Sequence, residues 1–327
     1  MDPLIIMWLG FILAAYSVVG NDVIQTLGTF LASNENRPWY VLWLFAASIM
    51  TATLVYGWYQ YDGDVSYQRL LGDGGFEDPK YLDPRNIPSF GWVYVIPPLI
   101  LMVITRFGIP VSTSFLILTF FNPKNLYDMV AKSMTGYLVA FLAAIILYIF
   151  ITKALEKKFA ANPIKDSEKT WWTVAQWAST GFLWTQWLAQ DFANIYVYLP
   201  RKVDGMTLAI SLGILLSMLA YIFYSKGGAI QSIVKAKSNT ADIRSATFID
   251  LTYGIVLYFF KEVNNIPMST TWVFLGLLAG REIALRYNLD KKIPRETLAD
   301  LGRDLGKVFF GLAISIALVF LIRWLTI

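Results

Sequence analysis

The sequence predicts an all-α polytopic membrane protein built from two inverted repeats, each with a broken helix and a re-entrant helical hairpin. Of its 327 residues, 56% are hydrophobic and only 15% are charged, whereas soluble domains carry about a quarter charged residues. The charges that remain are unevenly distributed between loops. Two short polar phrases also occur twice, in the same order, in the two halves of the chain. These three observations set the fold class.

The first half is predicted to contain a broken helix, a plain helix, a hairpin and a closing helix. Its first apolar stretch is interrupted near Gly20-Asn21-Asp22. Two later apolar arms are each shorter than the ~20 residues that a spanning helix needs, so they are expected to enter and leave on one side. The predicted order is broken helix 4–31, helix 39–59, polar loop 60–90, hairpin arms 91–105 and 110–121, and helix 127–151.

The second half repeats this order. Its long first segment is expected to break near Gln190-Asp191. The predicted elements are the broken segment 171–199, helix 206–224, hairpin arms 246–260 and 267–280, and a final helix that ends at 327. We therefore predict one repeat at 1–153, a cytoplasmic linker at 154–170 and a second repeat at 171–327.

Charge sets the expected topology. The loops 152–170, 225–245 and 281–307 hold more than half of the 27 Lys and Arg residues, while loop 60–90 is acidic. Basic loops favour the cytoplasmic side of a membrane. Both chain termini then lie outside, and the two halves cross the membrane in opposite senses. We expect a multi-pass protein of the cell (inner or plasma) membrane.

The chain has no Cys and no His. This excludes disulfides, the usual zinc sites and a Ser-His-Asp triad, so we do not expect an enzyme. No cofactor is expected beyond a coupling ion. The small net charge of +4 comes from loop residues and does not indicate nucleic-acid binding.

The repeated hinge phrases predict an anion site. Pro110 and Pro267 suit the first turn of a helix, where the missing N–H costs nothing. A helix N-terminus inside the membrane offers free N–H groups and a positive dipole end, which attract a tetrahedral oxyanion. Alternatively, the hydroxyls that follow only cap their own helices. The expected anion ligands are Ser112, Thr113, Ser114, Ser269, Thr270 and Thr271.

Two carboxylates inside apolar sequence predict a cation site. Asp22 and Asp191 are each flanked by amides, and such oxygen-rich groups coordinate cations. Two alternatives remain: each Asp caps a half-helix, or each carries a proton. The expected cation ligands are Asp22, Gln25, Gln190, Asp191 and Asn194, with Na⁺ at Asp22 and Asp191.

Three charged residues lie near the hairpin tips: Arg106, Lys261 and Glu262. Charges at mid-membrane are costly and need a partner. A base could hold the anion, or it could pair with Glu262 or a motif Asp. We expect pairing.

These phrases resemble those of the PiT-type inorganic phosphate transporters, which carry Gly-x-Asn-Asp-x-x-Asn and Pro-x-Ser-Thr-Thr-His phrases in each of two inverted halves. The matching segments here are Gly20-Asn21-Asp22-Val23, Pro110-Val111-Ser112-Thr113, Asp191 with Asn194, and Pro267 with Ser269-Thr270-Thr271.

The resemblance implies uptake of inorganic phosphate coupled to Na⁺, or in some relatives to H⁺, through a two-hairpin core in a homodimer. It also implies that Asn21 and the Ser/Thr clusters contact phosphate. This chain departs from the pattern: the motif His is replaced by Phe115 and Trp272, and the second Asn by Gln25. In the second phrase the leading Gly-x-Asn is replaced by Trp187-x-Ala189, with Gln190 before the Asp.

The sequence thus supports a secondary active transporter of inorganic phosphate, coupled to Na⁺ or H⁺ by alternating access. Three alternatives stay open. The chain could be a permease for sulfate or another oxyanion. It could instead be a channel-like conductance, or an anion sensor or scaffold that does not transport.

Overall fold

The computed structural model describes residues 2–88, 90–106, 112–151, 162–226, 242–263, 269–290 and 295–326, and every regular element among them is helical. Among the residues that the structure describes, five helices are long and apolar enough to cross a membrane, as expected for a multi-pass helical membrane protein. The α-helices are α1 (Pro3–Ser33), α2 (Trp39–Gln60), α3 (Ile96–Arg106), α4 (Thr113–Phe121), α5 (Leu126–Ile151), α7 (Asp166–Tyr196), α8 (Gly205–Tyr224), α10 (Ile243–Val263), α11 (Thr270–Asp290) and α12 (Arg295–Thr326).

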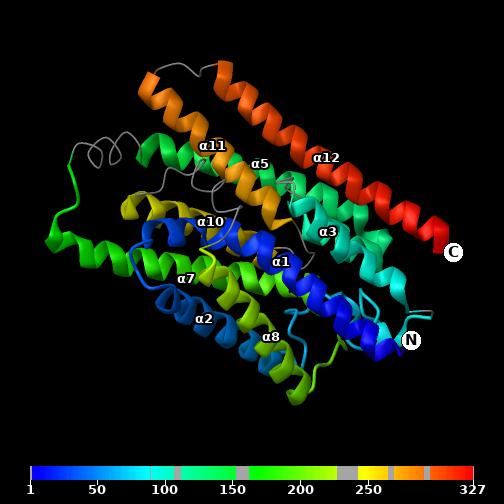
Figure 1. Cartoon of the computed structure of the whole chain (residues 1–327). Helices are drawn as coiled ribbons and strands as arrows, with labels where there is room; N and C mark the ends of the chain where they lie inside the picture. Colours follow the sequence, from blue (N-terminus) through cyan, green and yellow to red (C-terminus); the bar gives the residue numbers. More distant parts are fainter. Residues whose placement is uncertain are drawn as a thin grey trace.

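The helices form an elongated bundle with α1 running through its middle (Figure 1). Helix α1 contacts α3, α7, α8 and α10. The two most extensive helix–helix contacts join α5 to α11 and α7 to α10. In Figure 1 both chain termini lie toward the same end of the bundle. The membrane face on which that end lies stays a prediction, as do the inverted repeats and their boundaries.

The predicted helix breaks are wrong. Helix α1 passes through Gly20-Asn21-Asp22, and α7 passes through Gln190-Asp191, without interruption. Neither phrase contains proline, and one glycine inside a helix costs only about 1 kcal/mol. Packing of both helices inside the bundle outweighs that cost. Because Asp22 and Asp191 are interior helix positions, they do not act as N-caps.

The first hairpin agrees with the prediction, since α3 and α4 have only 11 and 9 residues. The second differs. Its arms, α10 and α11, have 21 residues each, or about 32 Å at 1.5 Å per residue, which is long enough to span. Helices α10 and α11 are therefore longer than the arms expected at 246–260 and 267–280. Polar residues beyond the apolar stretches continue both helices.

The predicted loop 281–307 is also mostly helical. Helix α11 continues to Asp290 and α12 begins at Arg295. Its charges pair along the helix surface: Arg286 lies 2.9 Å from Glu282, and Arg303 lies 3.0 Å from Asp300. Charges with this i,i+4 or i,i+3 spacing stabilise a solvated helix face. The other two predicted basic loops are 152–170 and 225–245. Their residues 152–161 and 227–241 lie outside the described residues.

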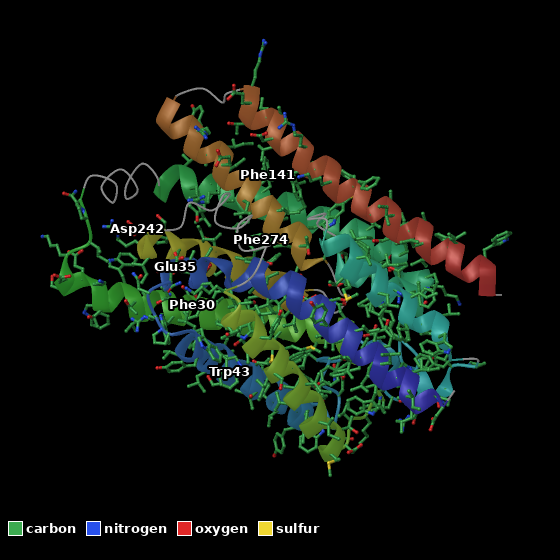
Figure 2. The ribbon with its side chains drawn as sticks, viewed as in Figure 1. Phe30, Glu35, Trp43, Phe141, Asp242 and Phe274 are labelled. Atoms are coloured by element: carbon green, nitrogen blue, oxygen red, sulfur yellow. The ribbon has the colours of Figure 1, made fainter. Side chains whose placement is uncertain are left out.

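Two glycines let α11 approach the backbone of α5 closely. A Cβ added at Gly276 would lie 2.4 Å from the carbonyl oxygen of Tyr137. A Cβ at Gly280 would lie 2.2 Å from that of Phe141. Small residues four positions apart allow such close helix packing in membranes. Figure 2 labels Phe141 on α5 and Phe274 on α11. The contact holds α11, and so its N-terminus, in a fixed position against α5.

The polar segment between α2 and α3 folds back onto the bundle. Asn122, just after α4, donates a 2.7 Å hydrogen bond to the carbonyl of Lys80. Asp64 accepts hydrogen bonds from the backbone of Ser66 at 2.8 Å and of Gln68 at 2.6 Å. Burial raises the pKa of Asp64 in spite of these bonds. The segment also inserts the side chain of Arg69, which is only 3% exposed, toward α7.

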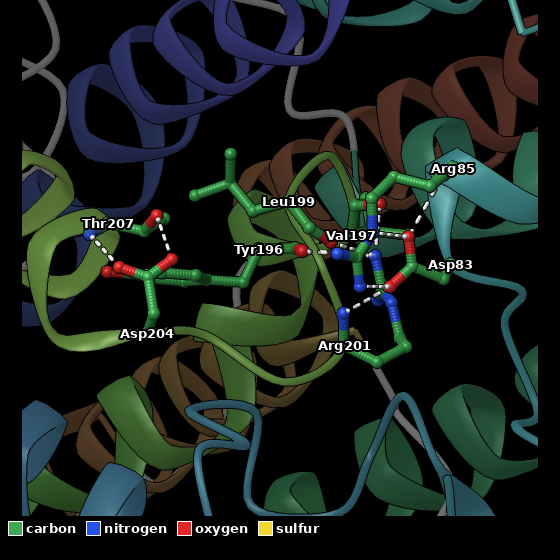
Figure 3. Close-up of polar contacts among 8 residues, drawn as sticks. All are labelled: Asp83, Arg85, Tyr196, Val197, Leu199, Arg201, Asp204 and Thr207. Carbon is green, nitrogen blue, oxygen red and sulfur yellow. Dashed lines mark hydrogen bonds and ion pairs between the residues drawn. The ribbon is translucent and has the colours of Figure 1, made fainter. Parts of the chain in front are cut away.

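A carboxylate fastens this segment to the connection between α7 and α8 (Figure 3). Asp83 accepts hydrogen bonds from Arg85 Nη2 at 2.8 Å and from the backbone N–H of Arg201 at 2.9 Å. The buried Arg201 guanidinium in turn donates to the carbonyls of Val197 and Leu199 at 2.5 and 2.7 Å. Burial lowers the pKa of Arg201 to about 10.

Removing this carboxylate should loosen the segment in a pH-dependent way. Burial alone would raise the pKa of Asp83, but the hydrogen bonds from Arg85 and Arg201 outweigh it and hold that pKa below 3.8. Its stabilising effect is therefore present above pH 4 and lost as the pH falls through the lowered pKa. We expect Asp83→Asn to cost about 1–3 kcal/mol of unfolding free energy at neutral pH.

Thermal unfolding of the detergent-solubilised protein between pH 3 and pH 7 measures this effect. The difference between variant and wild type should shrink toward the acid end. Glu77→Gln, a matched change at an exposed position of the same segment, should unfold like the wild type. A difference between Asp83→Asn and wild type that did not vary with pH would contradict the ionic role.

Candidate functional site

The N-termini of α4 and α11 have the same cap. Ser112 Oγ accepts a 3.3 Å hydrogen bond from the backbone N–H of Phe115. Ser269 Oγ accepts one of the same length from the N–H of Trp272. Both serines therefore cap their helices. A Ser or Thr that accepts in this way can still donate its own hydroxyl hydrogen to a ligand.

The two N-termini lie beside one another. The rings of Phe115 and Trp272 pack edge to face with centroids 6.0 Å apart. Both residues occupy the third helical position, so the turns that carry the Ser/Thr clusters are neighbours. All six hydroxyl side chains of these clusters are buried: Ser112, Thr113, Ser114, Ser269, Thr270 and Thr271. Two helix N-termini, each with positive dipole ends, thus meet inside the bundle.

Helix α7 joins these two N-termini through adjacent side chains. Asn194 Nδ2 donates to Thr113 Oγ1 at 3.0 Å and to Asp191 Oδ1 at 2.6 Å. On the other side, the Thr270 side chain interacts with the Asp191 carboxylate. Asp191 and Asn194 are 1% and 0% exposed. The structure therefore brings together the second-half carboxylate and both predicted anion clusters.

Three buried oxygens on one turn of α7 lack a hydrogen-bond donor among the residues that the structure describes: Gln190 Oε1, Asp191 Oδ2 and Asn194 Oδ1. The Gln190 amide is oriented by its Nε2, which donates to the carbonyl of Leu257 on α10 at 3.0 Å. Each unsatisfied buried acceptor costs about 1–3 kcal/mol. Carboxylate and amide oxygens are the ligands of hard cations, so a cation bound here would offset that cost.

Arg69 adds a positive charge that the sequence analysis did not assign to the site. Its Nε donates to the carbonyl of Ala189, two residues before Asp191 on α7, at 3.0 Å. Nothing in the sequence marks this arginine, because it belongs to an acidic polar segment that was expected to be solvated. Only the inward fold of that segment places it beside α7.

The first-half carboxylate cannot be compared in the same way. Helix α1 carries Asn21, Asp22 and Gln25, whose side chains lie outside the described residues. The same holds for the hairpin-tip charges Arg106, Lys261 and Glu262 and for the two hinge prolines, Pro110 and Pro267. Their roles stay predictions.

Helix α10 carries a buried carboxylate that neither repeated phrase contains. Asp250 on α10 is 1% exposed and accepts hydrogen bonds from Thr29 on α1 and Thr180 on α7. The signal was present, since an acid stands in the middle of the apolar stretch 246–260. It was overlooked because it belongs to neither repeated phrase.

Comparison with known proteins gives one informative likeness. No family model and no curated protein matches the chain. A solved structure described as "The sodium-dependent phosphate transporter" matches with a TM-score of 0.63 over 99% of this chain and 100% of that one, at 18% identity. The chain has the fold of that transporter. This agrees with the motif resemblance, which rests on separate observations.

Ser133 on α5, also missed from the sequence, positions the second N-terminus. Its Oγ accepts a 2.9 Å hydrogen bond from the backbone N–H of Ser269. Ser133→Ala would leave that buried N–H unsatisfied and should cost about 1–3 kcal/mol.

Thermal unfolding in detergent measures this cost. Ser217→Ala serves as the control, because Ser217 is exposed and bonds only to the Gly213 carbonyl of its own helix. Equal stability of the Ser133 and Ser217 variants would contradict the positioning role.

Proposed function

We propose that this protein is a secondary active transporter of inorganic phosphate, coupled to Na⁺ by alternating access. The observation that carries the proposal is the meeting of two helix N-termini around the buried pair Asp191 and Asn194. The likeness to a sodium-dependent phosphate transporter, at 18% identity, supports the fold in which such a site would work.

The anion part of the site would consist of backbone N–H groups and hydroxyls. The first turns of α4 and α11 supply Thr113, Ser114, Thr270 and Thr271 from two sides. An anion held between two helix N-termini is stabilised by both dipoles without needing a fully charged partner. The proposed ligand set also includes Asn21, which the resemblance implies.

The cation part explains the coupling. Phosphate placed next to the Asp191 carboxylate would be repelled by about 4 kcal/mol per pair of unit charges at 4 Å and an effective dielectric constant of 20. A cation bound to Asp191 Oδ2 and Asn194 Oδ1 removes this repulsion. Phosphate therefore binds well only when the cation is present. The amide oxygen favours a metal cation such as Na⁺, because a proton needs only the carboxylate.

The same oxygens bear on substrate choice. Hydrogen phosphate keeps a P–OH group that must donate to an acceptor, whereas sulfate has none at neutral pH. Buried acceptors left unpaired discriminate strongly against a ligand that lacks the donor. Gln190 Oε1, the unsatisfied acceptor that the cation leaves free, would therefore favour phosphate over sulfate.

The membrane arrangement belongs to this proposal as well. We place the basic segments in the cytoplasm, and the segment 60–90 and both termini outside, in a multi-pass homodimer of the cell membrane. The hairpins and α7 would move relative to one another so that the site opens to one side at a time.

Uptake of radiolabelled phosphate into proteoliposomes tests the function. Wild-type protein should take up phosphate under an inward Na⁺ gradient, and excess sulfate should compete weakly. Asp191→Asn should lower the initial rate by about 10- to 100-fold, the equivalent of a lost charged hydrogen-bond partner at about 1.5–3 kcal/mol.

Asp204→Asn is the matched control, because Asp204 caps α8 at an exposed position and Asn caps equally well. Wild-type uptake in Asp191→Asn would contradict the proposed site. Uptake that responded to no cation gradient would favour a channel, and phosphate binding without uptake would favour a sensor or scaffold. Strong competition by sulfate would favour a general oxyanion permease.

A further inference from the structure

Asp250 lies where three helices meet. It is on α10, and its carboxylate accepts hydrogen bonds from Thr29 on α1 and from Thr180 on α7, the latter at 2.5 Å. All three side chains are buried: Asp250 is 1%, Thr29 2% and Thr180 0% exposed. This junction is separate from the proposed phosphate site, because Thr180 and Asp191 are three helical turns apart, or about 16 Å along α7.

No counter-charge balances Asp250 in the part of the chain that the structure describes. Among the described residues, only the two threonine hydroxyls donate hydrogen bonds to its carboxylate. An ionised carboxylate is costly in an apolar bundle unless it is paired, so it takes up a proton or binds a cation. Helix α10 itself carries the other titratable residues Arg244, Tyr253, Tyr258, Lys261 and Glu262, with Asp242 just before it. The helices packed against α10 carry Tyr16 and Asp22 (α1), Asp166, Glu168, Lys169, Asp191 and Tyr196 (α7), Tyr127, Asp128, Lys132, Tyr137 and Tyr148 (α5), and Arg281, Glu282, Arg286, Tyr287 and Asp290 (α11).

The geometry favours a proton over a metal ion. Each threonine oxygen is in direct hydrogen-bond contact with a carboxylate oxygen, so a hydrogen atom lies between each pair. Both Asp250 oxygens already accept from hydroxyl donors, whereas the oxygens of Asp191 and Asn194 assigned to the cation lack a donor among the described residues. A threonine hydroxyl can both donate and accept, so the pair can serve the ionised and the protonated carboxyl alike.

We propose that Asp250 is a proton-binding site that takes up and releases one proton in each transport cycle. The proton adds to a carboxylate oxygen when the site faces one side and leaves to water when α10 parts from α1 and α7. No other bond forms or breaks. This inference rests on the proposed transport function, and it adds a second coupling ion to the cation at Asp191.

The position of Asp250 links this proton to the phosphate site. Helix α10 is tied to α7 at two points, by Asp250 to Thr180 and by the Leu257 carbonyl to Gln190. Gln190 is next to Asp191. Helix α10 also precedes the Ser/Thr cluster at the start of α11, and Tyr253 donates to the carbonyl of Thr270 at 3.2 Å. A change of charge at Asp250 therefore acts on the helix that orients both parts of the site.

Asp250→Asn tests the inference, because Asn resembles a permanently protonated Asp in shape. Net phosphate uptake into proteoliposomes should fall at least tenfold and lose its dependence on pH. Exchange of phosphate across the membrane at equal concentrations, which needs no proton release, should continue. A pH-sensitive dye inside the vesicles should report proton entry with phosphate for wild type and for the Asp204→Asn control, but not for Asp250→Asn.

Thr180→Val provides a second variant that keeps the carboxyl. The ionised form loses a charge-assisted hydrogen bond, which is stronger than the neutral one that the protonated form loses, so the midpoint of uptake against pH should move to higher pH. If both variants keep the wild-type pH profile and proton entry, the inference is wrong. It is also wrong if Asp250→Asn changes only the Na⁺ dependence, since that would indicate a metal ion at this position.

A spectroscopic measurement separates this inference from the proposed function. In infrared difference spectra recorded as the pH is raised, wild-type protein should lose the C=O band of one protonated carboxyl, and Asp250→Asn should lack that change. This result requires no phosphate transport. Identical spectra for the two proteins would overturn the proton site even if phosphate uptake were confirmed.

Discussion

Burial of carboxylates inside an apolar helical bundle is the constraint on which the rest of the molecule depends. Asp191 and Asp250 are both 1% exposed, and each interacts with side chains from other elements. Asp191 is joined through Asn194 to α4 and through Thr270 to α11. Asp250 draws α1 and α7 against α10. Two buried carboxylates thus connect α1, α4, α7, α10 and α11 inside an apolar bundle.

This constraint connects structure to coupling. A buried charge needs a compensating charge, and in the proposed transport cycle an ion from outside the protein supplies it. Its arrival and departure then bias the packing of the helices that surround the carboxylate. The close contact of α11 with α5 at Gly276 and Gly280 gives this arrangement a rigid support on one side.

Much of this could be predicted from the sequence. The helices at 39–59, 127–151 and 206–224 agree with α2, α5 and α8, because long apolar runs have few alternatives. The Ser/Thr clusters at 112–114 and 269–271 do begin helices, because proline and hydroxyl residues mark N-termini. The duplicated phrases indicated that residues far apart in the sequence lie close together, and Thr113 and Asn194 are indeed hydrogen-bonded.

Other features depended on tertiary packing that no local pattern reveals. Helices α1 and α7 continue through Gly20 and Gln190-Asp191 because the surrounding bundle stabilises them. Arg69 and Ser133 reach the site through a folded segment and a helix face that sequence spacing does not specify. Asp250 could have been noticed as an acid in an apolar stretch, yet only the structure supplies Thr29 and Thr180 as its partners.

The central claim is that the N-termini of α4 and α11 hold one tetrahedral oxyanion beside Asp191. A crystal structure with arsenate, a phosphate analogue located by its anomalous scattering, in the presence of Na⁺ tests it most directly. We expect one arsenic peak per chain, within hydrogen-bond reach of the residues 112–114 and 269–271. A peak elsewhere, with these two helix N-termini empty of anion at saturating arsenate, would contradict the account.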